Sequence, residues 1–143
     1  MVCTFFGHSD CYDLDSKKLR DAIEDMIHRD VVIFYVGNQG HFDRMVYSCL
    51  KQLRQVYPHI CISVVLAYPP VQKTDYLDTE DTIYPEIEKG LSRFAIPRRN
   101  AWMIDQSTHC ICYINHTWGK AYDFACLAKG RHLDVVNLGT AKL

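Results

Sequence analysis

Residues 31–42 read VVIFYVGNQGHF, and this stretch decides the fold class. Val31–Val36 is a continuous apolar run rich in β-branched and aromatic residues, which is typical of a strand buried on both faces of a parallel sheet. The turn Gly37–Gly40 follows at once and opens into His41–Tyr57, where apolar residues recur at helical spacing. A buried strand, a glycine turn and an amphipathic helix in succession predict an α/β fold with parallel strands.

The same alternation extends along the rest of the chain. Further strands are predicted at Val2–Phe6, Ile60–Ala67, His109–Asn115 and Leu133–Leu138, and further helices at Asp15–His28, Pro97–Ser107 and Gly119–Lys129. Right-handed crossovers join strands and helices of this kind into an open sheet. A length of 143 residues is that of one ordinary domain. We therefore expect a single α/β domain over residues 1–143, with an open, mostly parallel five-stranded sheet and helices on both faces.

Composition and charge exclude several classes of protein. Sixteen Lys and Arg residues against 17 Asp and Glu residues give a net charge of −1, so the chain carries no basic field for duplex nucleic acid. Its longest apolar runs are far shorter than the roughly 20 residues that a bilayer requires, and its first residues lack the charged region of a signal peptide. We expect a cytoplasmic protein with neither a membrane nor a nucleic-acid duplex as partner.

The cysteines are interpreted as reduced thiols. Seven is an odd number and, without an export signal, argues against a disulfide framework. No Cys-x-x-Cys pair occurs, so neither a structural zinc site nor any other metal or cofactor is predicted. Cys3, Cys61, Cys110 and Cys112 lie in apolar runs and are expected in the core. Cys11 lies in a polar loop, where a thiolate nucleophile is the alternative to the favoured interpretation as a core thiol.

Glycine turns at the ends of predicted strands indicate where a ligand would bind. In an open parallel sheet, ligands bind beyond the carboxyl ends of the strands. Gly7, Gly37 and Gly119 lie in turns that follow predicted strands, and a glycine there lets backbone N–H groups and a helix N-terminus approach an anion. A glycine that only permits the turn is the alternative at each position. Neither a dinucleotide nor a P-loop fingerprint occurs, so the pattern predicts phosphate binding without naming the ligand.

Polar and aromatic side chains near these turns complete the predicted site. A guanidinium from Arg98 or Arg99 can hold a phosphate, although at a helix start it opposes the dipole. Asp43 and Asp105 are candidates for ribose hydroxyls, His8 and His41 for phosphate, and Trp118 and Tyr68 for stacking on a base. Ordinary solvated, helical or core roles are the alternatives. The predicted ligand-binding residues are Gly7, His8, Ser9, Gly37, Asn38, Gln39, Gly40, Asp43, Arg98, Arg99, Asn100, Trp118, Gly119 and Lys120.

Residues 69–96 fit neither a strand nor a helix of this pattern. The segment opens with a Pro-Pro pair and carries four acids between residues 75 and 81, at spacings unlike those of a calcium-binding loop. A solvated loop with one short helix around Tyr84–Ser92 is the favoured interpretation. A lid over the ligand crevice is the alternative.

Two blocks of the sequence resemble a known superfamily. Cys3-Thr4-Phe5-Phe6-Gly7-His8 and residues 34–43 (FYVGNQGHFD) are similar to the SLOG superfamily, the Smf/DprA and Lonely Guy group, above all to its small stand-alone YpsA-like bacterial members. Looser matches extend the resemblance over nearly the whole chain, at Arg99-Asn100, Met103, Asp105, Trp118–Ala121 and Val135–Leu138. The resemblance implies a Rossmann-like domain that binds nucleotides or nucleotide-derived ligands at these turns, and it implies a homodimer or higher homo-oligomer.

The superfamily contains both binding modules and enzymes. SLOG domains sense cyclic ADP-ribose-type second messengers in antiphage signalling, whereas Lonely Guy enzymes cleave the N-glycosidic bond of nucleoside monophosphates. The enzymes carry Pro-Gly-Gly-x-Gly-Thr-x-x-Glu, and placing Trp118-Gly119 on its first glycine pair puts Ala125 where the catalytic Glu belongs. Ser9 stands where YpsA-like members often have Arg, and Lys120 stands where a second glycine is expected.

Three hypotheses about function follow. The leading one is a cytoplasmic domain that binds a nucleotide or ADP-ribose-derived ligand at the carboxyl edge of the sheet, as a sensor or a sequestering module. The second is N-glycosidic hydrolysis of a nucleoside monophosphate, with Asp10, Asp43 or Asp123 replacing the missing Glu. The third is a protein-interaction module that uses the acidic segment 75–88.

Overall fold

The computed structural model describes residues 1–69, 79–85, 87 and 90–143. Its regular elements are β1 (Val2–Gly7), α1 (Ser16–His28), β2 (Ile33–Val36), α2 (Gly40–Val56), β3 (Cys61–Val65), β4 (Thr82–Ile83), α3 (Ala95–Gln106), β5 (His109–Tyr113), α4 (Lys120–Gly130) and β6 (Asp134–Asn137). Two short 3₁₀ helices, η1 (Thr79–Asp81) and η2 (Ser92–Phe94), precede β4 and α3. The predicted α/β class is confirmed.

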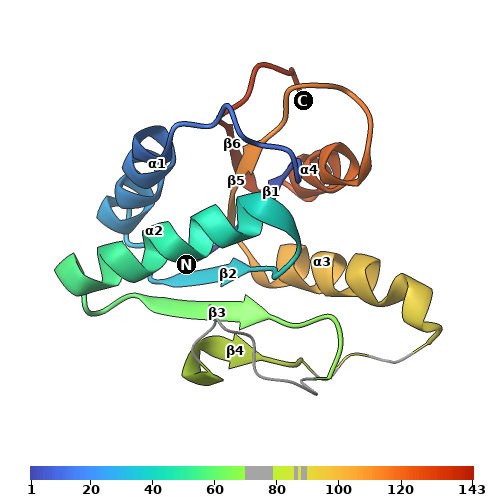
Figure 1. The fold of residues 1–143 in the computed structure, drawn as a ribbon, viewed down its shortest axis with the longest axis horizontal. Coiled ribbons are helices and arrows are strands. Elements are labelled where there is room, and N and C mark those ends of the chain that lie inside the picture. The colour runs from blue at the N-terminus through green and yellow to red at the C-terminus, as the bar shows by residue number, and fades with distance from the viewer. Residues whose placement is uncertain (70–78, 86, 88–89) are drawn as a thin grey trace.

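The strands form one open sheet in the order β4-β3-β2-β1-β5-β6, and every neighbouring pair is parallel. The chain first winds outward from β1 through β2, β3 and β4, and then returns to place β5 against the other side of β1. The direction of winding therefore reverses between β1 and β5, which makes this gap the topological switch point of the sheet. The arrows of β2 and β3 in Figure 1 point toward the side on which α3 begins.

The sheet has six strands rather than the predicted five. The additional strand, β4, has two residues and lies within the segment that sequence patterning assigned to a loop. Its position depends on Asp81, which is 5% exposed. Asp81 accepts hydrogen bonds from Arg54 at 2.7 and 3.1 Å and from the Tyr47 hydroxyl at 2.8 Å. These bonds attach the start of β4 to α2, a long-range contact that local sequence does not encode.

The segment between β4 and α3 departs from prediction in a second way. The short helix expected around Tyr84–Ser92 is not seen in the described part of that range, where only Ser92 belongs to a helical turn. Residues 86, 88 and 89 lie outside the described residues, as do residues 70–78. Helix α3 begins at Ala95, two residues before the predicted Pro97. Pro97 is still compatible with the helix because the first turn has no intrahelical partner for its missing N–H.

Helices cover both faces of the sheet, as predicted, and each face has its own apolar core. Helices α1 and α2 pack beside one another on one face, with Phe5 and Phe34 of the sheet fully buried beneath them. Helices α3 and α4 cover the other face, where Met103 and Ala125 are buried (Figure 1). Burial on both faces explains why the strands read as continuous apolar runs.

Seven free thiols are found, and their burial agrees with prediction at three of the four positions expected in the core. Cys3, Cys110 and Cys112 are fully buried, whereas Cys61 is exposed. Cys61 is the first residue of β3, and the strand becomes buried only from the next residue onward. None of the described helices has the length and apolar character that a membrane crossing requires.

Candidate functional site

The predicted turns meet at the carboxyl edge of the sheet, beside the switch point. Gly40, at the start of α2, has a φ of +85°, and a Cβ added there would lie 3.1 Å from Cβ of Ser9. The turn after β1 therefore packs directly on the turn after β2. Gly119, which precedes α4, has a φ of +94°, so both positions favour glycine for conformational reasons. The chain thus brings helix N-termini and turns from distant segments to one edge.

A cavity of about 130 Å³ opens among these turns. Seven of the residues predicted from sequence line it, namely Gly7, Gly37, Gln39, Asp43, Arg99, Asn100 and Lys120. The other lining residues are Phe5, Phe6, Ile96, Met103 and Ala121. Sequence reasoning missed these five because their apolar side chains were assigned to the core. Two of them could have been found from their place in the sequence, because Phe6 immediately precedes the first glycine turn and Ala121 follows Lys120.

Arg99 is the buried cation of the cavity. It is only 2% exposed, and burial lowers the pKa of its guanidinium. Its Nη1 donates to the Val65 carbonyl at 2.8 Å and to Asn38 Oδ1 at 3.3 Å, and its Nε donates to Asn100 Oδ1 at 2.7 Å. Nη2 has no hydrogen-bond partner among the described residues. All of these acceptors are neutral, so the guanidinium is held rigidly without a directly bound anion.

Asp43 is the acidic counterpart of Arg99 across Gly37. A Cβ added at Gly37 would lie 2.7 Å from Oδ2 of Asp43 and 3.0 Å from Cζ of Arg99, so both side chains press against this glycine. Oδ2 of Asp43 also accepts the backbone N–H of Gln39 at 2.9 Å. Burial raises the pKa of Asp43 to about 6, although the Gln39 N–H and the Arg99 charge both oppose the rise. The cavity therefore holds a carboxyl group that titrates near neutral pH.

The second cation is Lys120, the first residue of α4. Its side chain lines the cavity from the opposite side of the switch point and is exposed to solvent. The N-terminus of α4 adds the partial positive charge of its free backbone N–H groups. Arg99, Lys120 and this helix start give the cavity a positive rim with one carboxyl group, Asp43, inside it.

A stack of three rings stands next to the cavity. His8, 8% exposed, stacks on His116 with ring centroids 3.7 Å apart, and His116 stacks on Trp118 at 3.8 Å. Nδ1 of His116 lies 2.9 Å from the Trp118 carbonyl and donates to it, which fixes the orientation of the middle ring. Trp118 is 67% exposed, and Nε2 of His8 is buried without a partner in the part of the chain that the structure describes. Burial, together with the neighbouring His116, lowers the pKa of His8.

The remaining predicted residues border the cavity without lining it or lie elsewhere. His8, Ser9, Asn38, Gly40, Trp118 and Gly119 belong to the turns around the cavity. Arg98 points away: its Nη1 donates to the Leu91 carbonyl at 3.2 Å, and it lines a separate small pocket below β3 and α3. Arg99 also borders that small pocket, so Arg98 alone of the two arginines is absent from the cavity at the switch point.

Several weaker candidates are not brought to the cavity. Asp105 lies in the last turn of α3, at the opposite edge of the sheet, and pairs with Arg131. His41 contacts Tyr12 with the two rings tilted and their centroids 4.9 Å apart, and it lies outside the cavity. The Tyr68 hydroxyl donates to the Ser92 carbonyl at 3.3 Å. The structure does not bring Asp105 to the cavity, because a residue late in a crossover helix lies at the amino edge of the strands.

Cys11 is a core thiol and not an activated nucleophile. Its side chain is 0% exposed, its Sγ lies 3.8 Å from Sδ of Met45, and burial raises the pKa of the thiol. The polar loop around Cys11 folds so that this one residue turns inward. Among the described residues, no three His, Cys, Asp or Glu side chains gather in a way that could hold a metal ion.

Fold and site together define a class, an open all-parallel α/β domain of Rossmann-like architecture with a small polar cavity at its switch point. In comparisons with known proteins, no family model matches the chain, and no curated protein matches it.

Proposed function

We propose that this domain binds a nucleotide or an ADP-ribose-derived ligand, with its phosphate end in the cavity at the switch point, as a sensor or a sequestering module. The observation that carries the proposal is Arg99, a buried cation with neutral hydrogen-bond acceptors only. Burial of a charge is unfavourable unless an opposite charge compensates it. Asp43 supplies part of that charge to Arg99, although burial favours its protonated form, and a phosphate in the cavity would supply the rest to Arg99, to Lys120 and to the start of α4.

The size of the cavity supports the placement of the phosphate end. A volume of about 130 Å³ is well below the roughly 300–1,000 Å³ of pockets that enclose whole ligands of drug size. A phosphate with part of a ribose fits this space, while the remainder of a nucleotide would extend over the turns. Asp43 supplies an acceptor for ribose hydroxyls, and Trp118 offers an exposed ring face within the same set of turns.

Thermal unfolding with AMP, NAD, ADP-ribose and cyclic ADP-ribose tests this proposal. A ligand present at about 100 times its Kd stabilises the folded state by roughly 2.7 kcal/mol, which is readily measured. Lys120→Gln should weaken the response by about tenfold in Kd, since a charged hydrogen bond contributes about 1.5–3 kcal/mol. Lys142→Gln removes the same charge from an exposed position near the C-terminus and is the matched control. Absence of a shift with all four ligands at millimolar concentration would contradict the proposal.

The hydrolase hypothesis has one specific observation in its favour, and it concerns Asp43. Of the three candidate acids, Asp43 alone lines the cavity, whereas Asp10 and Asp123 are exposed outside it. A carboxyl with a pKa of about 6 can both accept and donate a proton near neutral pH. In such a reaction water would add to C1′ of the ribose, the N-glycosidic bond would break, and the base would leave with a proton.

Release of free base from AMP distinguishes the enzyme from the binding module. Hydrolysis by Asp43 requires that Asp43→Asn abolish release while Asp123→Asn leaves it unchanged. If AMP stabilises the protein and no base is released, the binding module stands and the enzyme does not. The interaction hypothesis depends on residues 75–88, of which 75–78, 86 and 88 lie outside the described residues.

A further inference from the structure

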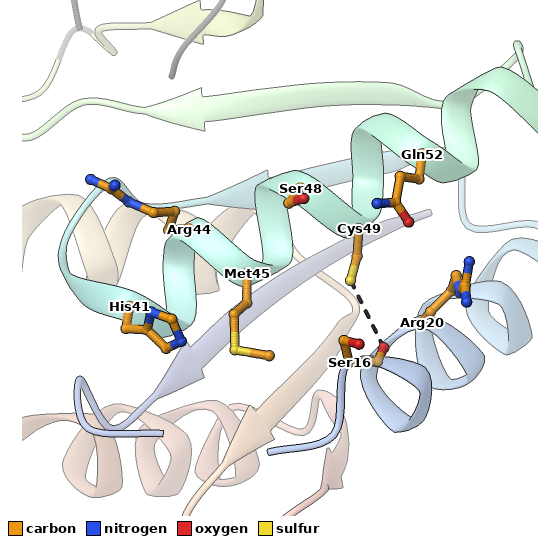
Figure 2. Close-up of a pocket in the computed structure, with 8 residues that line it drawn as sticks. All are labelled: Ser16, Arg20, His41, Arg44, Met45, Ser48, Cys49 and Gln52. Atoms are coloured by element: carbon orange, nitrogen blue, oxygen red, sulfur yellow. Dashed lines mark hydrogen bonds between the residues drawn. The ribbon is translucent and has the colours of Figure 1, made fainter. Parts of the chain in front are cut away.

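A second cavity lies on the outer side of the molecule, between α1 and α2. With a volume of about 350 Å³, it is larger than the cavity at the switch point. Its lining consists of Ser16, Arg20, His41, Arg44, Met45, Ser48, Cys49 and Gln52 (Figure 2). We refer to these residues as the α1–α2 groove. None of the eight is acidic, although the whole chain carries a net charge of −1.

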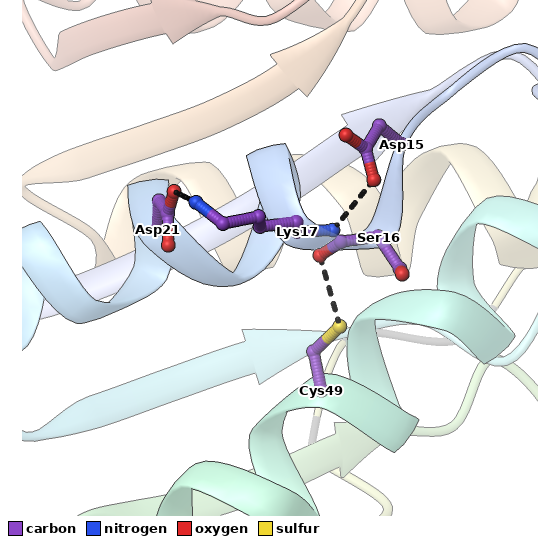
Figure 3. A network of polar contacts seen from close by, with 5 residues as sticks. All are labelled: Asp15, Ser16, Lys17, Asp21 and Cys49. Carbon is purple, nitrogen blue, oxygen red and sulfur yellow. Dashed lines mark hydrogen bonds and ion pairs between the residues drawn. The ribbon is translucent and has the colours of Figure 1, made fainter.

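The groove has a cationic and donor-rich rim over an apolar floor. Figure 2 places Arg44 and Arg20 toward its opposite ends, with Met45 and Cys49 between them. Cys49 is 6% exposed, and its thiol lies 4.0 Å from the Ser16 carbonyl, which joins the two helices at the floor (Figure 3). Hydroxyl and amide groups complete the rim. Such a surface suits an anion attached to an apolar body.

Arg20 is the side chain most clearly available to a ligand. It makes neither a hydrogen bond nor an ion pair with any described residue, although acids flank it on α1. Asp21 is bound instead by Lys17 Nζ at 2.9 Å, as Figure 3 shows, and Glu24 accepts the Tyr57 hydroxyl at 2.9 Å. Asp21 and Glu24 are therefore bound to other side chains, and neither of them pairs with the Arg20 guanidinium.

Charge also sets the end of the groove at which an anion is favoured. Beyond Arg20 and Gln52 lies a neighbouring hollow of about 270 Å³, and Asp21 and Glu24 are among its lining residues. Lys17 and Arg20 also line that hollow, so its two acids are balanced there; the His41 side of Arg20 has no acid in its lining and is therefore the side that favours an anion. The geometry points to a binding site for a small phosphate monoester with an apolar body, its phosphate on the Arg20 guanidinium and its body on Met45 and Cys49. This site is independent of the one at the switch point.

Titration of the protein with phenyl phosphate, followed by amide chemical shifts in NMR, tests the inference. We expect saturable shifts at Ser16, Ser48 and Gln52, tighter binding than inorganic phosphate, and no binding of phenol. Arg20→Gln should weaken binding by about tenfold or more, as loss of a charged hydrogen bond implies. Lys142→Gln removes an equal charge elsewhere and should change Kd by less than about twofold.

Three results would overturn the inference. They are the absence of saturable shifts in the groove at millimolar phenyl phosphate, shifts confined to the cavity at Asn100 and Lys120, and equal weakening by Arg20→Gln and Lys142→Gln. Repeating the titration with Lys120→Gln separates the two sites. That variant should leave binding in the groove unchanged, whichever way the proposal about the switch point is decided.

Discussion

Replacing Asp43 with asparagine should stabilise the protein at neutral pH, although the carboxyl is hydrogen-bonded and faces a cation. Burial raises the pKa of Asp43 from 3.8 to about 6, so the charged form is disfavoured in the folded state. Each pKa unit corresponds to about 1.4 kcal/mol, so ionised Asp43 lowers the free energy of unfolding by about 3 kcal/mol. Asparagine resembles the protonated form in shape and retains an oxygen acceptor for the Gln39 N–H.

The sign of the effect gives the prediction a distinct pH dependence. Between pH 3.8 and about 6 the folded state binds the proton of Asp43 more tightly than the unfolded state does, so this group's contribution to stability falls as pH rises. The variant lacks this titration. Its advantage over the parent protein should therefore be close to zero below pH 4 and reach about 3 kcal/mol at pH 7.

Urea denaturation of both proteins at several pH values from 4 to 7 measures this difference. Asp13→Asn, at an exposed position, is the control and should change stability by less than about 0.5 kcal/mol. The conclusion that ionised Asp43 lowers the free energy of unfolding would be refuted by an Asp43→Asn variant that is no more stable than the parent at pH 7, or whose advantage does not change with pH. If the variant is more stable but binds AMP more weakly, then Asp43 lowers stability and contributes to ligand binding.

Three further predictions concern the turns, the β4 attachment and the thiols. Gly37→Ala should destabilise the fold by about 1–3 kcal/mol in thermal unfolding, because the added Cβ would lie 2.7 Å from Asp43 Oδ2; an unchanged Tm would contradict the close packing. Asp81→Asn should speed amide exchange in β4, since it weakens the pair with Arg54. Burial raises the pKa of Asp81, but the hydrogen bonds from Arg54 and Tyr47, together with the nearby positive charges, outweigh burial and lower it. Its stabilising contribution should be present at neutral pH and be lost on acidification below pH 3.8. In the native state the exposed thiol of Cys61 should react with a thiol reagent before the buried thiols of Cys3, Cys110 and Cys112, and mass spectrometry identifies the modified site.

The fold was predictable because burial on both faces leaves a clear mark in the sequence. Every strand with a long apolar run was located within two or three residues, and the parallel arrangement followed from the alternation with helices. The strand β4 was missed because its two residues form no run and its attachment depends on Arg54 and Asp81, which are 27 positions apart. Contacts of this range have no local signature.

The candidate site was predictable in its backbone more than in its side chains. Glycine turns at strand ends located the cavity, because parallel strands end at one edge. The direction of each side chain was not predictable: Arg99 faces the cavity while Arg98 leaves it, a difference set by the rotation of α3 about its axis. Likewise, the burial of Cys11 against Met45 of α2 depends on how its loop folds, and the polar residues beside Cys11 in the sequence gave no sign of it.

The stack of His8, His116 and Trp118 places a fluorescent side chain, Trp118, beside the carboxyl edge of the sheet. The His116 ring stacks on the Trp118 indole with the ring centroids 3.8 Å apart, so the surroundings of that indole change if the stack opens. The second tryptophan, Trp102, is partly buried and lies against Tyr35 at 5.2 Å, so its emission depends on different neighbours. Light emitted by Trp118 therefore reports whether the rings beside the carboxyl edge remain stacked, without any label being attached.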